Sequence, residues 1–365
     1  MDGSVAAKGK TNMATRSKLA AARKDAHIDL SMSPVTKSGV DSGFDRLSFD
    51  HCALPDLQFA NLDLSQTFLG RPLSAPLMIG AMTGGTPRAE AINAALAEVA
   101  QSQKIAFAVG SQRAALELGH SAKNLRFLAP DIPIIGNLGA VQLAQGGGVA
   151  LAQAAIEDLE ADAIAIHLNP LQELIQPEGE RDWRGVSVAI EALVKAVNVP
   201  VIVKEVGAGI NADIAAQLFD MGVSAVDVAG AGGTNWARIE AARHKADASL
   251  YDPFLDWGMT TIDCLLAVTA RCKGRLVIAS GGVRHGLDVM RGYWLGADMV
   301  SIAGPMLRHL LNDNKTPAAK DLDAFVEQIH EQMRMTLFLT GAANLQTFRE
   351  VAARLDGFRF NQTPD

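Results

Sequence analysis

Eight short, almost wholly apolar segments recur along the chain, and most are followed by a loop of small polar residues and then an alanine-rich amphipathic segment. Apolar segments without strict alternation are typical of parallel strands that are buried on both faces. Strands that alternate with helices in this way indicate an α/β fold built on a parallel sheet. The predicted strands are residues 75–80, 105–110, 132–137, 163–168, 200–206, 224–230, 275–280 and 299–304.

Eight such units predict a (β/α)8 TIM barrel. A doubly wound open sheet is the alternative, and it is disfavoured because no GxGxxG sequence opens a helix after the first strand. We expect a single domain at residues 23–365, with an N-terminal cap at 23–74, the barrel at about 75–310 and C-terminal helices at 311–365. The small and charged residues at 1–22 predict a disordered N-terminal extension.

The composition argues against several classes of protein. The net charge is -7, so the protein as a whole is not built to coat nucleic acid. No segment reaches the ~18 apolar residues of a membrane span, and the first residues lack the apolar centre of a secretory signal. The three cysteines form no CxxC pair, so neither a disulfide framework nor a cysteine zinc site is expected. A small-molecule ligand and a reducing cytoplasm are the resulting expectations.

Polar or glycine residues follow every predicted strand, at the end where TIM barrels carry their active sites. The strongest signal comes from three glycine-rich loops, "AGAGGT", "ASGGVRHG" and "SIAGPML", which follow the sixth, seventh and eighth strands. Glycines permit close approach of backbone N–H groups to an anion. Each loop alone is also consistent with a tight turn, but three together favour a phosphate site, with Thr234 as a further donor.

Lys204 ends the fifth apolar strand, where an ammonium group is costly to bury without a negative partner. A rim salt bridge, for instance with Glu205, is one interpretation. A Schiff base is a second, and contact with the anionic edge of a reduced flavin is a third.

The fourth strand runs directly into "HLNPLQE". Glu173 is a carboxylate at a barrel mouth beside a predicted phosphate site, which favours Mg²⁺, an ion that prefers oxygen ligands. Asn169 and Gln172 are neutral and suited to orienting a substrate or water. His167 is either a ligand or proton carrier, or a histidine satisfied by the neighbouring backbone.

A basic segment, "RKDAHIDL", precedes the barrel and places Arg23, Lys24 and His27 on adjacent helical turns. A solvated basic face is one interpretation. The other is an arm that folds over the barrel mouth and neutralises a diphosphate, with Arg113 assisting from inside.

Taken together, these motifs resemble type II isopentenyl-diphosphate isomerase, an FMN-dependent (β/α)8 enzyme. The resemblance extends from about residue 23 to about residue 310. It depends on "RKDAHI", "ALPDL", "FLGRPLSAPLMIGAMTGG", "VGSQR", "HLNPLQE", "VIVKEVGAGI", "AGAGGTNWARIE" and "SGGVRHGLDVMRGYWLGADMVSIAGPML". Two positions depart from the family pattern: Asn235 stands where serine is usual, and Ala81 precedes Met82 where relatives often have serine.

The resemblance implies a role for each matched position. FMN would be held by Ala81, Met82, Thr83, Ser111, Asn137, Lys204, Thr234, Gly281, Gly282, Val283, Arg284, Ala303 and Gly304. The diphosphate substrate would meet Arg23, Lys24, His27, Ser111, Gln112, Arg113, Asn169 and Gln172. Glu173 would bind Mg²⁺, and Gln172, Lys204 and His167 would form the catalytic group.

The reaction that the resemblance implies is the reversible conversion of isopentenyl to dimethylallyl diphosphate. Reduced FMN would serve as acid and base, Mg²⁺ would lie on the diphosphate, and NADPH would reduce the flavin without net oxidation of the substrate. The resemblance also implies a homotetramer or homo-octamer.

Two other kinds of protein remain alternatives. An FMN-dependent 2-hydroxy-acid oxidase shares the SGGVR loop, but it needs a histidine before that loop, and His285 follows it. An inosine-monophosphate dehydrogenase needs a cysteine in a mobile loop, whereas Cys264 and Cys272 lie in a helix-like segment. A flavin-binding protein without activity is the alternative outside enzymes, and the HLNPLQE cluster argues against it.

Overall fold

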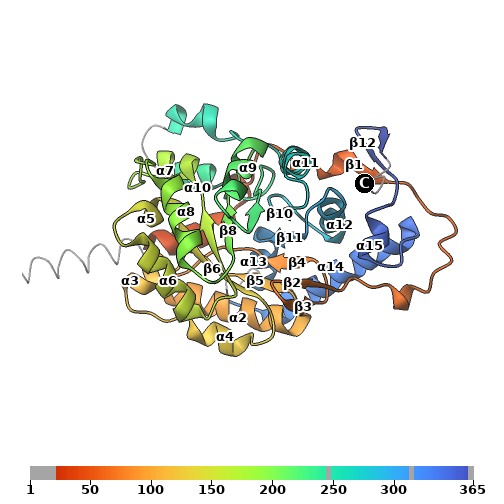
Figure 1. The fold of residues 1–365 in the computed structure, drawn as a ribbon, viewed down its shortest axis with the longest axis horizontal. Coiled ribbons are helices and arrows are strands. Elements are labelled where there is room, and N and C mark those ends of the chain that lie inside the picture. Colours follow the sequence, from red (N-terminus) through yellow and green to blue (C-terminus); the bar gives the residue numbers. More distant parts are fainter. Residues whose placement is uncertain (1–21, 244–247, 312–315, 361–365) are drawn as a thin grey trace, which may run out of the picture.

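Eight parallel strands close into a barrel in the computed structural model, which describes residues 22–243, 248–311 and 316–360 (Figure 1). Neighbouring strands pair in sequence order, and the last pairs with the first through Val300–Ile302 and Leu77–Ile79. All eight predicted strands and the TIM barrel are confirmed, and the open sheet is wrong. The strands are β4 (Leu77–Ile79), β5 (Ala106–Ala108), β6 (Ile134–Gly139), β7 (Ala163–His167), β8 (Val201–Lys204), β9 (Ala225–Asp227), β10 (Leu276–Ala279) and β11 (Met299–Ile302).

Helices cover the outside of the barrel (Figure 1). The side chain of Thr86 caps the first of them by accepting from the N–H of Ala89, and Pro87 occupies its first turn, where no N–H is needed. The helices are α2 (Pro87–Gln103), α3 (Arg113–Glu117), α4 (Lys123–Leu128), α5 (Ala140–Ala144), α6 (Gly148–Leu159), α7 (Pro170–Ile175), α8 (Val186–Ala196), α9 (Ala212–Asp220), α10 (Trp236–Arg243), α11 (Thr261–Arg271), α12 (Gly286–Trp294), α13 (Gly304–Leu311), α14 (Ala319–Thr340) and α15 (Leu345–Phe348).

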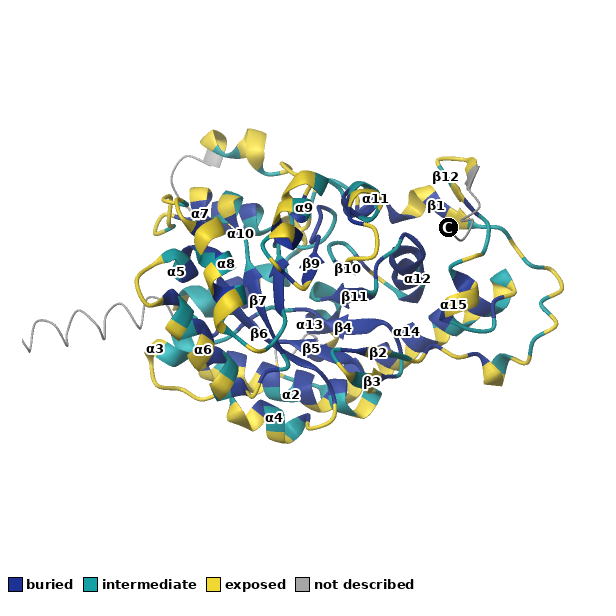
Figure 2. Cartoon of the chain, in the orientation of Figure 1, coloured by how far each residue is buried: buried dark blue, intermediate teal, exposed yellow. Residues whose placement is uncertain are grey.

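Each barrel strand is buried on both faces, which explains the lack of alternation in the sequence (Figure 2). Met78, Ile135 and Met299 fill the barrel interior together with small side chains such as Ala163. The residues between them, such as Leu77, pack outward against the helices in a second cluster. That outer cluster extends from Ile28 in the N-terminal segment to Ala353 near the C-terminus, so both flanking segments share the core of the barrel.

The sequence predicts only helices at residues 311–365, and this is wrong in part because the segment also contains two strands. β12 (Ala353–Leu355) pairs with β13 (Phe358–Phe360) and with β1 (Leu47–Phe49) from the N-terminal segment. Asp356 and Gly357 join the two C-terminal strands, and both have positive φ. Such a two-residue turn favours Asp-Gly, so the "LDGF" sequence held a hairpin signal that our sequence analysis missed.

The remaining elements are short. β2 (Gln66–Phe68) and β3 (Arg71–Leu73) form a hairpin whose Phe68 and Leu73 join the barrel's interior cluster. Single-turn helices lie at η1 (Pro34–Thr36), η2 (Phe44–Arg46), η3 (Phe59–Asn61), η4 (Ala248–Leu250) and η5 (Asp252–Phe254). The predicted extension at 1–22 lies outside the described residues, apart from position 22, which belongs to a helix described over residues 22–31.

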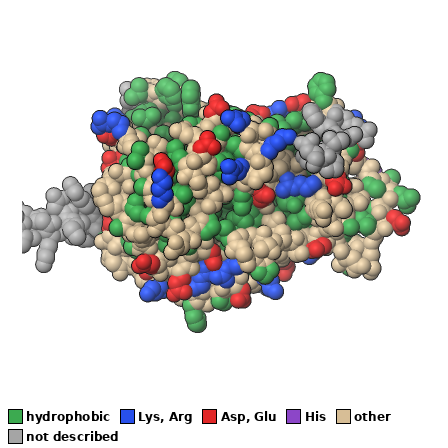
Figure 3. Space-filling model, in the orientation of Figure 1, with side chains coloured by type: hydrophobic (Ala, Val, Ile, Leu, Met, Phe, Trp, Pro, Cys, Tyr) green, Lys and Arg blue, Asp and Glu red, His purple; other side chains and the backbone are tan. Residues whose placement is uncertain are grey.

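The surface view in Figure 3 shows acidic and basic side chains interspersed, without a broad patch of one sign on that face of the described residues. No helix within the described ranges has both the length and the apolar character that crossing a bilayer requires.

His330 on α14 makes stability depend on pH. Its Nε2 atom is buried and has no hydrogen-bond partner among the described residues. Burial, assisted by the charge of Arg334, lowers the pKa of His330 to about 4. The unfolded chain therefore binds more protons than the folded one between the ordinary histidine pKa of ~6.5 and about 4. Stability contributed by the neutral ring is complete above this window and is lost as the pH falls through it.

We predict that His330→Leu flattens the acid dependence of stability. Urea unfolding at several pH values should show wild type losing up to about 3 kcal/mol more free energy of unfolding than the variant on acidification through that window. Parallel pH profiles for the two proteins would contradict this role for His330.

Candidate active site

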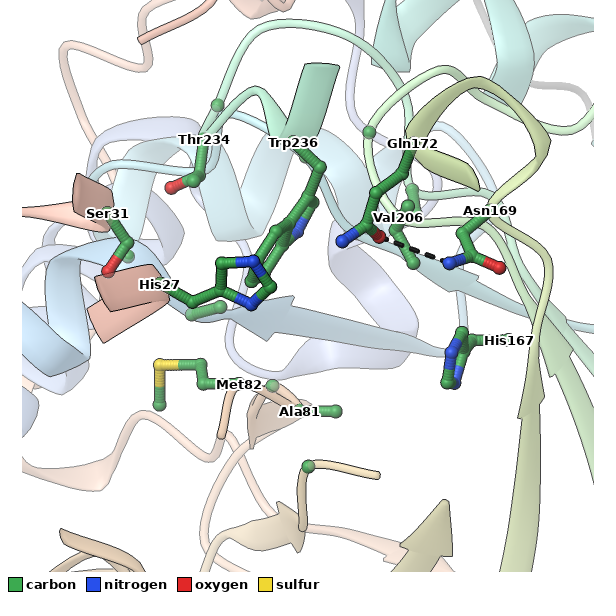
Figure 4. A pocket seen from close by; sticks show the side chains of 18 of the residues that line it. His27, Ser31, Ala81, Met82, His167, Asn169, Gln172, Val206, Thr234 and Trp236 are labelled. Atoms are coloured by element: carbon green, nitrogen blue, oxygen red, sulfur yellow. Dashed lines mark hydrogen bonds between the residues drawn. The ribbon is translucent and has the colours of Figure 1, made fainter. Parts of the chain in front are cut away.

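One cavity of about 710 Å³ opens at the carboxyl ends of the barrel strands (Figure 4). Loops that follow strands from β4 to β11 contribute to its lining, as does the helix through residues 22–31. Parallel strands in a closed barrel all end at the same rim, so residues far apart in sequence meet there.

All but one of the predicted site residues line this cavity. Gln112 is the exception: its side chain donates to the carbonyl of Ala155 at 3.0 Å and accepts from the N–H of Asn137 at 3.0 Å. It therefore braces β6 and α6, and the expected contact with substrate has no support in this geometry. The lining includes Arg23, Lys24, His27, Ala81, Met82, Thr83, Ser111, Arg113, Asn137, His167, Asn169, Gln172, Glu173, Lys204, Thr234, Gly281, Gly282, Val283, Arg284, Ala303 and Gly304.

The glycine-rich loops pack directly on one another. A Cβ on Gly281 would lie 2.0 Å from the carbonyl oxygen of Gly230, and one on Gly233 would lie 2.7 Å from the nitrogen of Gly282. Gly281 and Gly282 both have positive φ. The interpretation that these glycines form a tight turn is thus correct for the loop after the seventh strand. This turn does not exclude anion binding, because the glycine-rich loops also line the cavity.

Arg284 is held by carboxylates. Its guanidinium donates to Asp288 at 2.8 Å and to both carboxylate oxygens of Asp45 at 3.0 and 3.1 Å. Hydrogen bonds to Asp288 and Asp45 raise the pKa of Arg284 above its usual range. Its charge is already paired, so any contact of this residue with a phosphate falls to its backbone.

Lys204 ends β8 inside the barrel. Its Nζ donates to the carbonyl of Glu205 and lies 4.0 Å from Oδ2 of Asp227. Burial raises the pKa of Asp227, although the charge of Lys204 opposes this shift. The carboxylate of Glu205 accepts four backbone N–H groups from residues 206–209 instead. The salt-bridge interpretation of Lys204 therefore holds with Asp227 as the partner, and not with the Glu205 side chain.

His167 has a defined tautomer. Asn137 donates through Nδ2 to the carbonyl of Val109 at 3.1 Å, which leaves Oδ1 to accept from Nδ1 of His167 at 2.8 Å. The Nε2 atom of His167 is then the acceptor of a neutral ring. Burial and the charges of Lys204 and Lys24 lower the pKa of His167 to about 3, so the ring is not a proton donor at neutral pH.

The first turn of α7 holds three predicted residues together. Asn169 donates through Nδ2 to Gln172 at 3.2 Å and to Glu173 at 3.0 Å, and Figure 4 shows the first of these contacts. The second carboxylate oxygen of Glu173 accepts from the N–H of Glu180 at 2.8 Å. Within residues 22–243, 248–311 and 316–360, no three acidic, histidine or cysteine side chains cluster as a metal site. A magnesium ion here would need water and substrate oxygens beside Glu173.

The helix through residues 22–31 lies at the cavity mouth and is not a fully solvated face. Lys24 and His27 line the cavity, and His27 is buried. Burial and the charges of Arg23 and Arg113 lower the pKa of Lys24 to about 8. Mutual repulsion among these cations is what an anionic ligand would relieve.

Comparison with known proteins decides the family. Residues 152–354 match the FMN-dependent dehydrogenase family. The isopentenyl-diphosphate delta-isomerase of Stutzerimonas stutzeri is 47% identical over 90% of this chain and 95% of its own. The enzyme of that name from Xanthobacter autotrophicus is 48% identical, over 90% and 96%.

This chain belongs to the isopentenyl-diphosphate delta-isomerase family. It is an enzyme of the isomerase class, and the FMN-dependent family match agrees with the type II resemblance predicted from its sequence. Solved structures with the same fold include a putative lactate oxidase from Pediococcus acidilactici, with a TM-score of 0.65 and 17% identity over 86% of this chain and 84% of that one. A mandelate oxidase with benzoyl-formic acid has a TM-score of 0.62 and 15% identity, over 88% and 92%. At such identities the likeness shows the fold alone.

The cavity of this isomerase-family chain has one further feature that suits a polar ligand. Thr83 is buried against the cavity, and its hydroxyl has no hydrogen-bond partner among the described residues. A buried hydroxyl without a partner is costly, and a polar ligand in the cavity would supply one.

Glu240, which contacts two of the predicted site residues from behind the cavity lining, is the main residue that our sequence analysis missed. This fully buried carboxylate on α10 lies 2.9 Å from Nε2 of His27, accepts from Nε2 of Gln172 at 3.1 Å, and accepts from Arg243. Trp236, one turn earlier on α10, packs edge-on against His27 with centroids 5.3 Å apart (Figure 4). The spacing of Trp236, Glu240 and Arg243 on one helical face was the available signal.

Charge on Glu240 is maintained despite burial. Burial alone would raise the pKa of Glu240, but the hydrogen bonds from His27 and Gln172 and the charge of Arg243 bring it below its usual range. Burial lowers the pKa of His27, although its hydrogen bond to Glu240 and the charge of Glu240 oppose this shift.

We predict that Glu240→Gln loosens the helix at residues 22–31, because it removes the buried negative charge that His27 contacts and Arg243 pairs with. Urea unfolding should show a loss of about 3 kcal/mol, and trypsin should cleave at Arg23 and Lys24 faster than in wild type.

Glu178→Gln is the matched control, since Glu178 also pairs with Arg23 and Arg243 but its side chain is 44% exposed. It should cost less than about 1 kcal/mol. Equal effects of the two substitutions would rule out a special role for the buried carboxylate.

Proposed function

We propose that this enzyme interconverts isopentenyl and dimethylallyl diphosphate, with FMN in its reduced form, Mg²⁺ on the diphosphate and NADPH as the reductant that maintains the flavin. The observation that supports this most is the joining of two anion-binding regions in one cavity. Glycine-rich loops after β9, β10 and β11 form one region, and the basic residues Arg23, Lys24 and Arg113 form the other.

FMN, when bound, supplies an electron-rich ring able to exchange a proton with the substrate and to stabilise developing positive charge. Lys204 would place its ammonium group against the negative charge of that ring. Asn137, Ser111, Thr83 and the backbone of residues 281–284 and 303–304 would complete the binding site.

The substrate's diphosphate would bind between Arg23, Lys24 and Arg113, with Glu173 holding Mg²⁺ beside it. A diphosphate next to Lys24 would favour the charged form of this lysine, whose pKa is otherwise lowered to about 8. Gln172 would orient the reacting end of the substrate, because Asn169 and Glu240 fix both ends of its amide. His167 would offer Nε2 as a hydrogen-bond acceptor, and it would not donate the proton.

The oxidase alternative has less support. His285 caps α12 by accepting from the N–H of Asp288, and it is not among the residues that line the cavity. The lining histidines within the described chain are His27 and His167, and neither adjoins the seventh-strand loop.

Two further expectations remain proposals. A homotetramer or homo-octamer would be tested by light scattering of the purified protein. A reducing cytoplasm is supported by three free cysteines.

We predict that anaerobic protein with FMN, Mg²⁺ and isopentenyl diphosphate forms dimethylallyl diphosphate only after the flavin is reduced. NADPH should be needed in catalytic amounts, because the substrate is not oxidised. Product formed at one NADPH per turnover, or formed equally with oxidised flavin, would contradict the mechanism. Bound FMN without product would return the function to oxidation or flavin binding.

We predict that Glu173→Gln keeps FMN bound but lowers the Mg²⁺-dependent rate by roughly a hundredfold or more, because a neutral amide is a poor ligand for a hard cation. Rates measured against Mg²⁺ concentration, with flavin absorbance as the control for binding, would test this. A normal rate in the presence of a chelator would remove Glu173 from the metal site.

A further inference from the structure

Arg308 is a cation beside the glycine-rich loops of the cavity. The family resemblance implied no role for it. It lies on α13, one turn after Gly304, and lines the cavity. A Cβ on Gly304 would lie 3.2 Å from Nη1 of Arg308 and 3.0 Å from Oγ1 of Thr234. The guanidinium and the hydroxyl thus converge beside the same glycine.

This guanidinium differs from the other cavity-lining arginines. Arg23 pairs with Glu178, Arg113 pairs with Glu117, and Arg284 pairs with Asp288 and Asp45. Arg308 has no hydrogen-bond acceptor or anionic partner within the described chain, although it is partly buried. Burial lowers the pKa of Arg308, and no anion among the described residues offsets this shift.

A partly buried cation without a partner costs free energy, and a bound anion would recover it. The surrounding loops carry hydrogen-bond donors, since Thr234 lies beside Arg308 and the N–H of Gly282 donates no hydrogen bond within the described chain. Such donors are neutral, so a dianionic phosphate bound to them alone would keep its full charge.

We propose that Arg308 binds the phosphate group of FMN and supplies the positive charge that the glycine-rich loops lack. This assignment depends on the proposed function only in requiring that the cavity hold FMN. Arg308 would discriminate FMN from riboflavin, which has the same ring and ribityl chain but no phosphate.

Lys37 is the competing cation. It also lines the cavity, and its backbone forms an isolated antiparallel β-bridge with that of Thr234. However, its side chain is exposed, so its ammonium group keeps its hydration and gains less from a bound phosphate.

The test compares FMN with riboflavin. Dissociation constants of the full-length protein for both ligands would be measured by equilibrium dialysis, in wild type, Arg308→Met, Arg308→Lys and Lys37→Met. Arg334→Met is the matched control, because it removes one arginine charge from an exposed position on α14. Riboflavin binding itself reports whether each variant retains the folded cavity.

We expect Arg308→Met to weaken FMN binding roughly tenfold to a hundredfold, in line with loss of a charge-assisted hydrogen bond, and to change riboflavin binding by less than about twofold. Arg308→Lys should recover part of the loss. Lys37→Met and Arg334→Met should leave the preference for FMN over riboflavin unchanged.

Several results would overturn the assignment. Equal loss of both ligands in Arg308→Met would indicate a structural role, and an FMN-specific loss in Lys37→Met without one in Arg308→Met would transfer the contact to Lys37. A protein that binds neither ligand in its wild-type form would refute the proposed function together with this assignment. A protein that binds FMN regardless of residue 308 would refute this assignment alone.

Discussion

Closure of the eight parallel strands is the constraint on which every other feature depends. A closed sheet has no free edge, and it directs all eight carboxyl ends to one rim. The interior is filled by large side chains such as Met78 and Met299 and small ones such as Ala163, so it is a packed core and not a channel. Ligands can therefore enter only at the rim, where the loops contribute glycines, amides and charges from opposite sides of the barrel.

Charge at this rim is distributed unevenly. The buried carboxylates are matched by protein donors: Glu205 by four backbone N–H groups, Asp227 by Ser280 and the N–H of Ala229, and Glu240 by side chains from two other segments. Because Glu205 is committed to its loop, the salt bridge of Lys204 is made with Asp227, at 4.0 Å. Two lining cations are less well matched: Arg308 has no anionic partner within the described chain, and burial together with neighbouring positive charges lowers the pKa of Lys24. Two anionic groups, one on a substrate and one on a cofactor, would supply the missing partners of these cations.

The sequence predicted the barrel, and nearly all of the predicted site residues line the cavity, because both follow from local patterns. Apolar segments mark strands, and the residues immediately after them must lie at the rim. Prediction failed where the direction of a side chain depends on tertiary contacts. Gln112 follows a strand like its neighbours, but its side chain hydrogen-bonds to the backbone of α6 and not to the cavity. The Arg284 side chain pairs with Asp45, which lies more than 200 residues away in the sequence. Glu240 and Arg308 lie inside helices, one or more turns beyond the strand ends, so reading strand ends could not find them.

Glu240 joins the two ends of the proposed substrate site. His27 and Lys24 lie on the same helical turn of the N-terminal arm, and His27 reaches the carboxylate that also accepts from Gln172. A diphosphate bound at Lys24 would hold this arm down, and the docked arm keeps His27 and Trp236 packed around Glu240. The amide of Gln172 is then fixed between Glu240 and Asn169. Under the proposed function, binding of the diphosphate and orientation of the reacting end would therefore be physically coupled, and the contributions of the helix at residues 22–31 and of Gln172 would not add as independent terms.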